Sequence, residues 1–237
     1  MRIEILYSDL CCLYGDKGNT MFLRQCLPGA EFIETRLNDT PAFLSGNVDL
    51  VYLCSMSEKS QELILSRLMP HKDTIAAMAK EGDTLFFAVG NSLELLGQYI
   101  QREDGSRVEA LGLFDTWAVR QTPNRFNSLM RIGFEGMPLL GYTSRFSHTQ
   151  GLTEDIAFGR VEAGAGANPE AKIEGIRSGK VLATYLSGPV LVANPDFAHW
   201  FLKELGAPVE KLPCEEALRQ AYDQRLKDFS RPDLEMA

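Results

Sequence analysis

Only a few side chains in this sequence could combine into a nucleophile and its base. A Ser–His or Cys–His pair must draw its imidazole from His71, His148 or His199. His71 follows a proline in a connection between helices, and His199 lies inside a predicted helix, so we interpret both as surface or packing residues. His148 falls in a segment rich in loops and is the one histidine that we treat as a candidate site residue.

Two residues are candidate nucleophiles. Ser92 ends the tripeptide Gly-Asn-Ser at 90–92, which is an abbreviated form of the G-x-S turn that displays a serine. Glu94 stands where that pattern has its closing glycine, and Ser92 could equally cap the helix that follows. Cys54 ends a predicted core strand and could be a reactive thiol, but free cysteines are among the most buried residue types. Ser92 or Cys54 could form an active centre with His148, or both could be structural residues, and the sequence leaves both interpretations open.

The cysteines give no sign of a disulfide framework or a metal site. Their number is odd, two of them are adjacent, and none forms a C-x-x-C pair. We therefore expect reduced thiols, no metal and no cofactor. The five residues are Cys11, Cys12, Cys26, Cys54 and Cys214.

The composition is that of an ordinary soluble globular protein, with 45% apolar and 24% charged residues in a chain of 237. A net charge of −8 and a pI near 5.0 disfavour a nucleic-acid surface. The first ten residues do not read as a signal peptide, and no apolar run approaches the roughly 20 residues of a membrane span. We expect one cytoplasmic domain over residues 1–237.

The first half of the chain alternates strand and helix patterns. This alternation predicts a mostly parallel sheet with helices on both faces, a three-layer α/β/α architecture. Ser57 is a good helix N-cap and Gly82 a helix stop, while Leu93, Leu96 and Ile100 predict a helix after residue 90. The expected strands are 3–7, 32–37, 49–54 and 84–89, and the other helices are 20–26, one after Ser57, and 73–81.

The second half has short strand patterns and little helical periodicity until its end. Pro195 after an asparagine starts a helix that stops at Gly206, and a last helix is expected over 215–229. The expected strands are 116–121, 129–134, 156–161, 173–177 and 181–186.

Three segments, taken in order, carry a resemblance. They are Leu13–Asn19 (LYGDKGN), Gly90–Gly97 (GNSLELLG) and Thr184–Leu191 (TYLSGPVL), the last followed by Asn194-Pro195. Together they resemble the cobyric-acid-synthase-like branch of class I glutamine amidotransferases, and within it the amidotransferase subunits of lipid II isoglutaminyl synthases. The resemblance implies a flavodoxin-like sheet and a Mur-ligase-like, ATP-dependent partner subunit that uses ammonia in cell-wall peptide amidation.

The same resemblance implies a catalytic cysteine on a strand-to-helix turn, a late histidine and an oxyanion loop rich in glycine. Here Gly90 stands at the turn and Ser187 at the histidine position. Cys54-Ser55-Met56 replaces the expected glycine pair, and 141–145 lacks the histidine expected in mid-chain. Glycine keeps such a turn without the strain of a side chain, so these changes predict a retained fold with discarded chemistry.

We therefore expect a degenerate subunit that binds or regulates its partner, with a small amide or anionic ligand as a further candidate. Asp16 and Asn19 are either a scaffold for partner docking or ordinary turn residues. Arg125 and Arg145 could bind an anion in the former pocket or be paired elsewhere. Asn91, beside the turn, completes the expected binding residues. An active enzyme with a relocated nucleophile and a domain that needs no partner are the alternatives.

Overall fold

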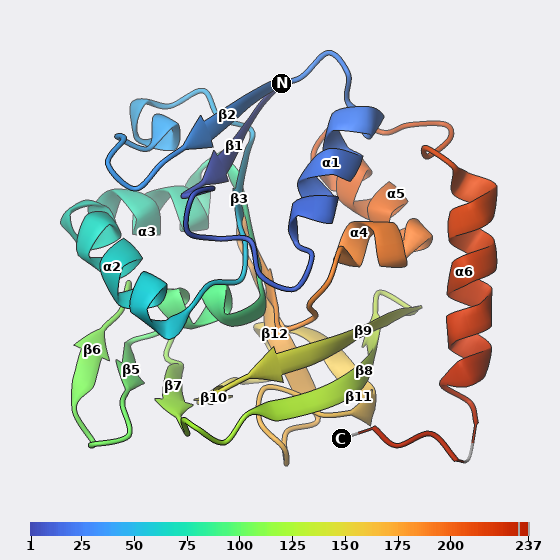
Figure 1. The fold of residues 1–237 in the computed structure, drawn as a ribbon. Coiled ribbons are helices and arrows are strands. Elements are labelled where there is room, and N and C mark those ends of the chain that lie inside the picture. The colour runs from blue at the N-terminus through green and yellow to red at the C-terminus, as the bar shows by residue number, and fades with distance from the viewer. Residues whose placement is uncertain (232, 237) are drawn as a thin grey trace.

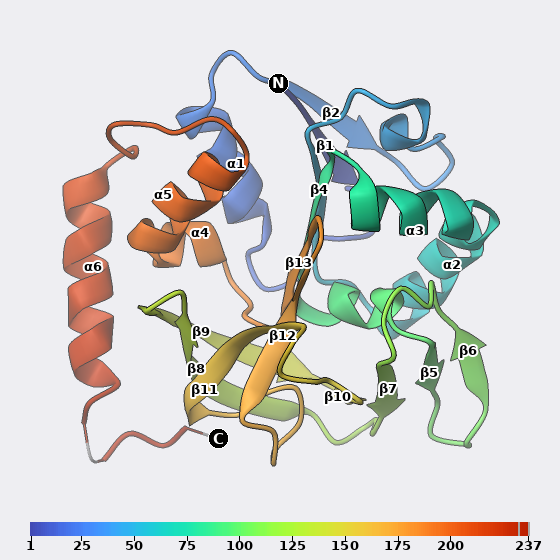
Figure 2. The same cartoon turned by 180° about the vertical axis from the view of Figure 1, so that it is seen from behind.

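A nine-stranded sheet with helices on both faces forms the centre of the computed structural model, which describes residues 1–231 and 233–236 (Figures 1 and 2). The strand order is β2-β1-β3-β4-β13-β12-β11-β8-β9. The first five strands in this order are parallel, as the alternating pattern predicts. They are β2 (Glu31–Thr35), β1 (Arg2–Leu6), β3 (Leu50–Leu53), β4 (Leu85–Val89) and β13 (Val181–Thr184).

These strands form where the sequence has short apolar runs, because both faces of the parallel part are covered. Every residue of β3 and β13 is buried. Helices α2 and α3 cover one face, and α1, α4 and α5 cover the other (Figures 1 and 2). The four strands expected in the first half are confirmed, with their ends shifted by at most two residues.

The helix boundaries follow local signals. The Ser57 Oγ accepts a hydrogen bond from the Ser60 N–H at 3.2 Å, which confirms the predicted N-cap. Gly82 has φ −78°, so it is not the left-handed stop that we expected; a Cβ there would lie 2.6 Å from the Met78 carbonyl oxygen. The helices are α1 (Lys17–Cys26), α2 (Glu58–Leu68), α3 (Lys72–Glu81), α4 (Val190–Ala193), α5 (Pro195–Glu204) and α6 (Glu215–Asp228), with 3-10 turns η1 (Ala42–Ser45) and η2 (Met69–His71).

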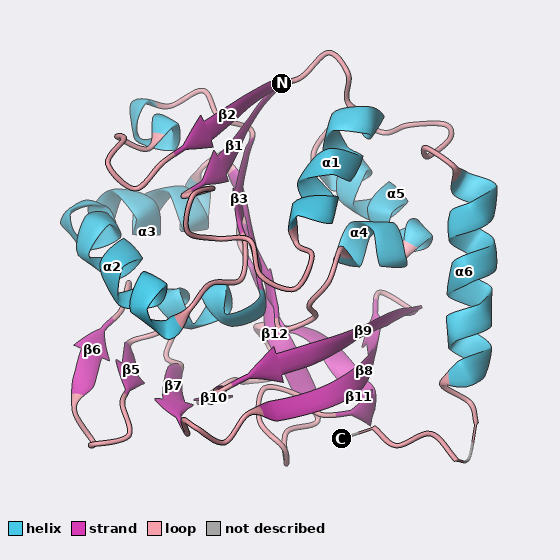
Figure 3. Cartoon of the chain, viewed as in Figure 1, coloured by secondary structure: helices cyan, strands magenta, loops and turns pink. Residues whose placement is uncertain are grey.

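Antiparallel strands extend the sheet on the side of β13. They are β12 (Ile173–Ser178), β11 (Ala157–Gly164), β8 (Phe126–Phe134) and β9 (Met137–Arg145). A second sheet lies beneath α2 and has the order β10-β7-β5-β6, with β10 (Ser147–Gln150), β7 (Trp117–Arg120), β5 (Tyr99–Gln101) and β6 (Arg107–Glu109) (Figure 3). The sequence patterns missed β5, β6, β9 and β10.

The segment after β4 differs from the prediction. It is a short 3-10 helix, η3 (Gly90–Leu96), and Ile100 belongs to strand β5 instead of the same helix. Hydrogen bonds from the Leu111 and Leu113 N–H groups to the carbonyls of Leu95 and Leu96 end the helix there. The apolar spacing that predicted a longer helix reflects burial of the turn and of β5 in one core.

No helix among the residues that the structure describes is long and apolar enough to cross a membrane.

Candidate functional site

The site is built around Gly90, the residue that follows β4. Gly90 is buried and has φ +63°, a left-handed conformation that favours glycine. A Cβ placed on it would lie 2.2 Å from the Oγ of Ser55 and 3.6 Å from the Oγ of Ser187. The fold therefore brings together the three positions where the sequence departs from its resemblance, and the Ser55 side chain occupies the space that a side chain at 90 would need.

Ser55 is held there by a buried carboxylate. Its Oγ donates to Asp16 Oδ2 at 2.5 Å, and its backbone N–H donates to the same oxygen at 2.9 Å. Burial raises the pKa of Asp16 to about 6, while the two bonds from Ser55 oppose that rise. Asp16 Oδ1 is buried without a hydrogen-bond partner in the described structure. The Ser55–Asp16 pair therefore lies directly against Gly90.

Ser187 is also engaged within the protein. Its N–H donates to the Tyr142 carbonyl at 2.8 Å, and its hydroxyl donates to the Tyr185 carbonyl at 3.2 Å. Gly188 follows with φ +84°. Where the resemblance predicts a histidine that acts as base, the fold places a short hydroxyl that is bonded to backbone.

The backbone donors after β3 are likewise occupied. The Ser55 N–H is taken by Asp16, and the Met56 N–H donates to Asn91 Oδ1 at 3.0 Å. Asn91 returns a bond from its Nδ2 to the Met56 carbonyl at 2.7 Å. Asn91 therefore fastens the loop after β3 to the turn after β4, and neither of these two N–H groups is free to bind an oxyanion.

The two expected docking residues of the first loop are internal. Asp16 and Asn19 are both fully buried. Asn19 donates to the Tyr52 hydroxyl at 2.8 Å and accepts from the Leu191 N–H at 2.9 Å, so it joins α1 to α4. Their side chains make hydrogen bonds inside the protein and hold the loop after β1 in place.

The two candidate nucleophiles have structural contacts. The Ser92 Oγ lies 2.7 Å from the Val89 carbonyl oxygen and 3.1 Å from that of Leu53, and Ser92 is fully buried. Burial raises the pKa of the Cys54 thiol well above its usual range, which keeps it protonated. No hydrogen bond in the described part of the chain joins either residue to an imidazole.

The candidate base does not reach the turn either. His148 lies in β10, edge-on to the Phe126 ring with centroids 5.1 Å apart. Burial, together with the nearby charge of Arg145, lowers the pKa of His148 to about 4, and its buried Nδ1 has no hydrogen-bond partner among the described residues. His199 is bonded to Glu215 at 3.1 Å. The described structure therefore assembles no Ser–His or Cys–His pair.

Arg145 is a core residue and not a wall of a pocket. Its guanidinium donates to the carbonyl of Gly166 at 2.6 Å and to the hydroxyl of Thr143 at 3.1 Å. It also lies over the Tyr185 ring, 3.8 Å from the centroid. Arg145 is almost completely buried, so the structure does not support an anion site at this residue.

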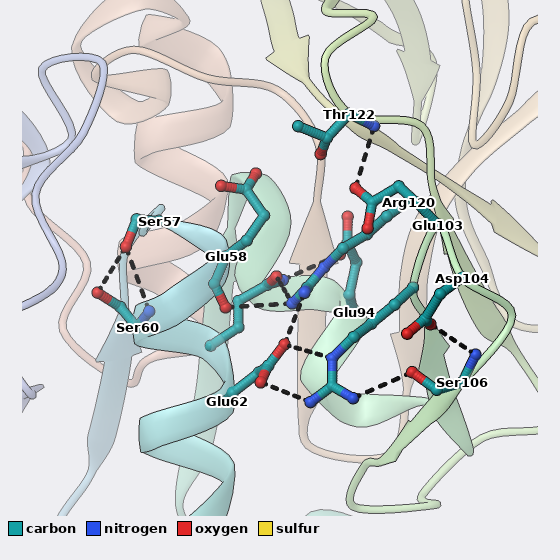
Figure 4. A network of polar contacts seen from close by, with 12 residues as sticks. Ser57, Glu58, Ser60, Glu62, Glu94, Glu103, Asp104, Ser106, Arg120 and Thr122 are labelled. Atoms are coloured by element: carbon teal, nitrogen blue, oxygen red, sulfur yellow. Dashed lines mark hydrogen bonds and ion pairs between the residues drawn. The ribbon is translucent and has the colours of Figure 1, made fainter.

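A polar network that the sequence patterns missed supports the turn from below (Figure 4). Gln61 donates to the Asn91 carbonyl at 2.8 Å and to the buried carboxylate of Glu94 at 2.9 Å. Arg120 donates to Gln61 at 3.1 Å and to Glu62 at 2.7 Å. The network thus connects α2, η3 and the second sheet.

The network could not be found from spacing, because its members lie far apart in the sequence, in α2, η3 and β7. Burial raises the pKa of Glu94, while hydrogen bonds from Ser147, Gln61 and Tyr185 oppose the rise. The one sequence signal was Glu94 itself, a charged residue within an otherwise apolar helix pattern.

Two tyrosines lie beside Gly188, and an arginine contacts one of them. Tyr14 has φ +57° and contacts Tyr142 edge-on, with ring centroids 6.3 Å apart. The Tyr142 hydroxyl donates to the Tyr14 carbonyl at 3.2 Å. Arg125 donates to the Tyr14 hydroxyl and, at 3.2 Å, to Ser144, and it stacks on Phe146. No cluster of metal-ligating side chains occurs among the described residues.

Comparisons with known proteins agree with the fold and with the resemblance. The family model for the CobB/CobQ-like glutamine amidotransferase domain matches residues 2–195. The GatD subunit of lipid II isoglutaminyl synthase (glutamine-hydrolyzing) from Streptococcus pneumoniae (strain ATCC BAA-255 / R6) is 27% identical over 239 residues, which cover 96% of this chain and 91% of that protein. The GatD subunit from Staphylococcus aureus (strain N315) is 26% identical over 207 residues, covering 86% and 84%.

Solved structures support the fold alone. A glutamine amidotransferase crystal structure superposes with a TM-score of 0.57 at 18% identity, covering 86% of this chain and 99% of that one. The PurLQS structure from Thermotoga maritima gives 0.54 at 12% identity, covering 95% and 98%. They confirm the expected flavodoxin-like fold of class I glutamine amidotransferases.

Proposed function

The chain belongs to the CobB/CobQ-like glutamine amidotransferase family, and on that premise we propose that it is a subunit for lipid II amidation that does not itself hydrolyse glutamine. It binds a Mur-ligase-like, ATP-dependent subunit and acts as its binding or regulatory partner in the cytoplasm. The link to lipid II comes from the GatD relatives, which carry that activity in their names.

The observation that carries this proposal is the filled space at the turn. A nucleophile at 90 would need a Cβ where Ser55 Oγ lies, only 2.2 Å away. Real Cβ atoms do not approach another heavy atom so closely, so a side chain at 90 requires the Ser55 side chain to move out of its hydrogen bond with Asp16. Position 90 therefore lacks a nucleophilic residue and also lacks space for a side chain while Ser55 keeps this conformation.

The surroundings support the same proposal. The helix after the turn is a seven-residue 3-10 helix, which offers a thiolate little of the dipole stabilisation that a long α-helix gives. Two backbone donors of the former oxyanion loop are bonded to Asp16 and Asn91. Catalysis would need a new nucleophile, a new base and new oxyanion donors together.

A glutaminase assay with the purified Mur-ligase-like subunit of the source organism tests the first half of the proposal. We expect no release of ammonia above the rate without protein. Active enzymes typically turn over on the order of 1 to 1,000 times per second. Ammonia released at such a rate would overturn the proposal.

Alanine variants would then locate the active centre. Loss of a measured activity in S92A or C54A, together with H148A, would support the relocated nucleophile instead.

Co-elution of the two purified proteins on a sizing column tests the second half. We expect a complex with equal amounts of each subunit, with or without glutamine. The proteins are mixed at about 10 µM, a concentration well above the dissociation constants of ordinary stable complexes. Separate elution under these conditions would contradict the proposed role as a partner subunit.

A further inference from the structure

Strand β8 is only half covered on the side that faces away from β9. It pairs with β9 along its whole length, from Phe126 to Phe134. On its other side β11 pairs with residues 130–133, up to Gly164, and the Ala165 N–H that follows donates to the Ser128 Oγ at 3.2 Å. Residues 126–129 of β8 therefore offer a strand edge without a neighbouring strand, a site where an extended peptide can add.

The direction of the free backbone groups follows from the register. Tyr142 of β9 faces away from β8, because its carbonyl accepts the Ser187 N–H. Leu129 is paired with Tyr142 in the register, so its own backbone groups face away from β9. The Leu129 N–H is consequently available to a peptide on the outer edge.

The chain's own tail already uses this group. The segment after α6 returns to β8, and the Leu129 N–H donates to the carbonyl of Met236 at 2.7 Å (Figure 1). Glu235 and Met236 also line a groove of about 460 Å³, together with Tyr14 and Tyr142. The tail thus contacts the outer edge of β8 through a main-chain carbonyl, and its last described residues form part of the wall of the groove.

Tyr142 connects the groove to the residues around Gly90. Tyr142 forms one wall of the groove, and its carbonyl is bonded to Ser187, which neighbours the turn. Arg125 borders the groove through its bonds to Tyr14 and Ser144, and it has no acidic partner among the described residues. A positive charge without an acidic partner, beside this groove, suits a peptide that brings an acidic residue next to an apolar one.

We propose that the free edge of β8 and this groove are the docking site for an extended acidic and apolar peptide segment of the partner subunit, and that the tail occupies the site until the partner displaces it. The partner is the Mur-ligase-like subunit, so the inference rests on the proposed function. It adds where that subunit binds and what regulates the binding.

The test compares the full chain with a chain that ends at Ser230, using calorimetry with the purified Mur-ligase-like subunit. Removal of residues 231–237 leaves α6 complete, since that helix ends at Asp228. For a tail that is docked in about nine of ten molecules, only about one tenth are competent to bind, and truncation then tightens Kd about tenfold. Equal affinities for the two chains would overturn the inference and leave the proposed function standing.

A matched pair of variants in the truncated chain tests the strand edge itself. Leu129→Pro removes the N–H that faces outward, whereas Leu129→Ala shortens the side chain and keeps the N–H. We expect L129P to lose the gain from truncation and L129A to keep most of it. Equal binding by L129P and L129A would overturn the docking mode.

Hydrogen exchange gives a reading that does not depend on how well L129P folds. The Leu129 amide of the truncated chain should exchange at least tenfold more slowly in the complex than alone. Unchanged exchange in a complex that forms would refute the inference. No complex with either chain would instead refute the proposed function, and this inference with it.

Discussion

Substitution of Gly90 by alanine measures how firmly the turn excludes a side chain. The added Cβ would stand 2.2 Å from Ser55 Oγ in a backbone with φ +63°. A left-handed conformation costs a residue with a side chain roughly 1–2 kcal/mol. Overpacking in a buried site costs roughly 1–3 kcal/mol more. We therefore expect G90A to lower the free energy of unfolding by about 2–5 kcal/mol.

Urea unfolding followed by circular dichroism is the assay. Gly105→Ala is the matched control, because Gly105 has φ +83° and no heavy atom within 4 Å of its added Cβ. G105A should lose only the conformational part, roughly 1–2 kcal/mol. The difference between the two variants is then the cost of the contact with Ser55.

Ser55→Gly in the G90A background completes a double-mutant cycle. The coupling between positions 55 and 90 should be favourable by roughly 1–3 kcal/mol, because S55G removes the atoms that the new Cβ meets. If G90A were no more destabilising than G105A, or if S55G gave no relief, the filled-space explanation of the turn would be refuted.

Three other expectations follow from buried groups. The pKa of Asp16 rises from 3.8 to about 6 on folding, so between these pH values the folded state binds more protons than the unfolded state. The free energy of unfolding should therefore fall by about 3 kcal/mol as pH rises through that window. Urea titrations at pH 4 and 7 should show this difference in the parent protein and lack it in D16N. Thiol labelling followed by mass spectrometry should modify exposed Cys12 in the folded protein and spare Cys54, whose buried thiol stays protonated; rapid labelling of both would contradict the burial. R120A should destabilise the protein by about 1–3 kcal/mol, because it leaves the buried Gln61 Oε1 without its donor. R102A, whose side chain is 38% exposed, should cost about 1 kcal/mol or less, and a larger loss for R102A than for R120A in chemical denaturation would argue against this network.

The parallel part of the fold could be predicted because its strands are continuous apolar runs that need no partner to be recognised. Leu50–Leu53 and Leu85–Val89 are examples. The hairpin of β8 and β9 was half missed, although Glu135 and Gly136 between them both have positive φ, as a two-residue hairpin turn requires. The turn signal was weak because glutamate is an unusual residue in that conformation.

The candidate site could be predicted in position but not in mechanism. The order of the motifs pointed to Gly90, Ser187 and Ser55, and the fold brings these three together. That the Ser55 side chain fills the space beside Gly90, with Asp16 behind it, depends on a contact across 39 residues that no local pattern records. Arg145 was wrongly expected to line a pocket because it belongs to β9, a strand that the sequence patterns missed, and the packing of that strand buries its side chain.

The contact between positions 55 and 90 also has an evolutionary consequence. A lineage that regained a cysteine at 90 by one codon change would meet the Ser55 hydroxyl and lose stability before it gained any chemistry. Two coordinated changes are needed, and the intermediate is penalised whenever the change at 90 comes first. Under the function that we propose, a return to hydrolysis is therefore open mainly along the order in which the change at 55 precedes the change at 90.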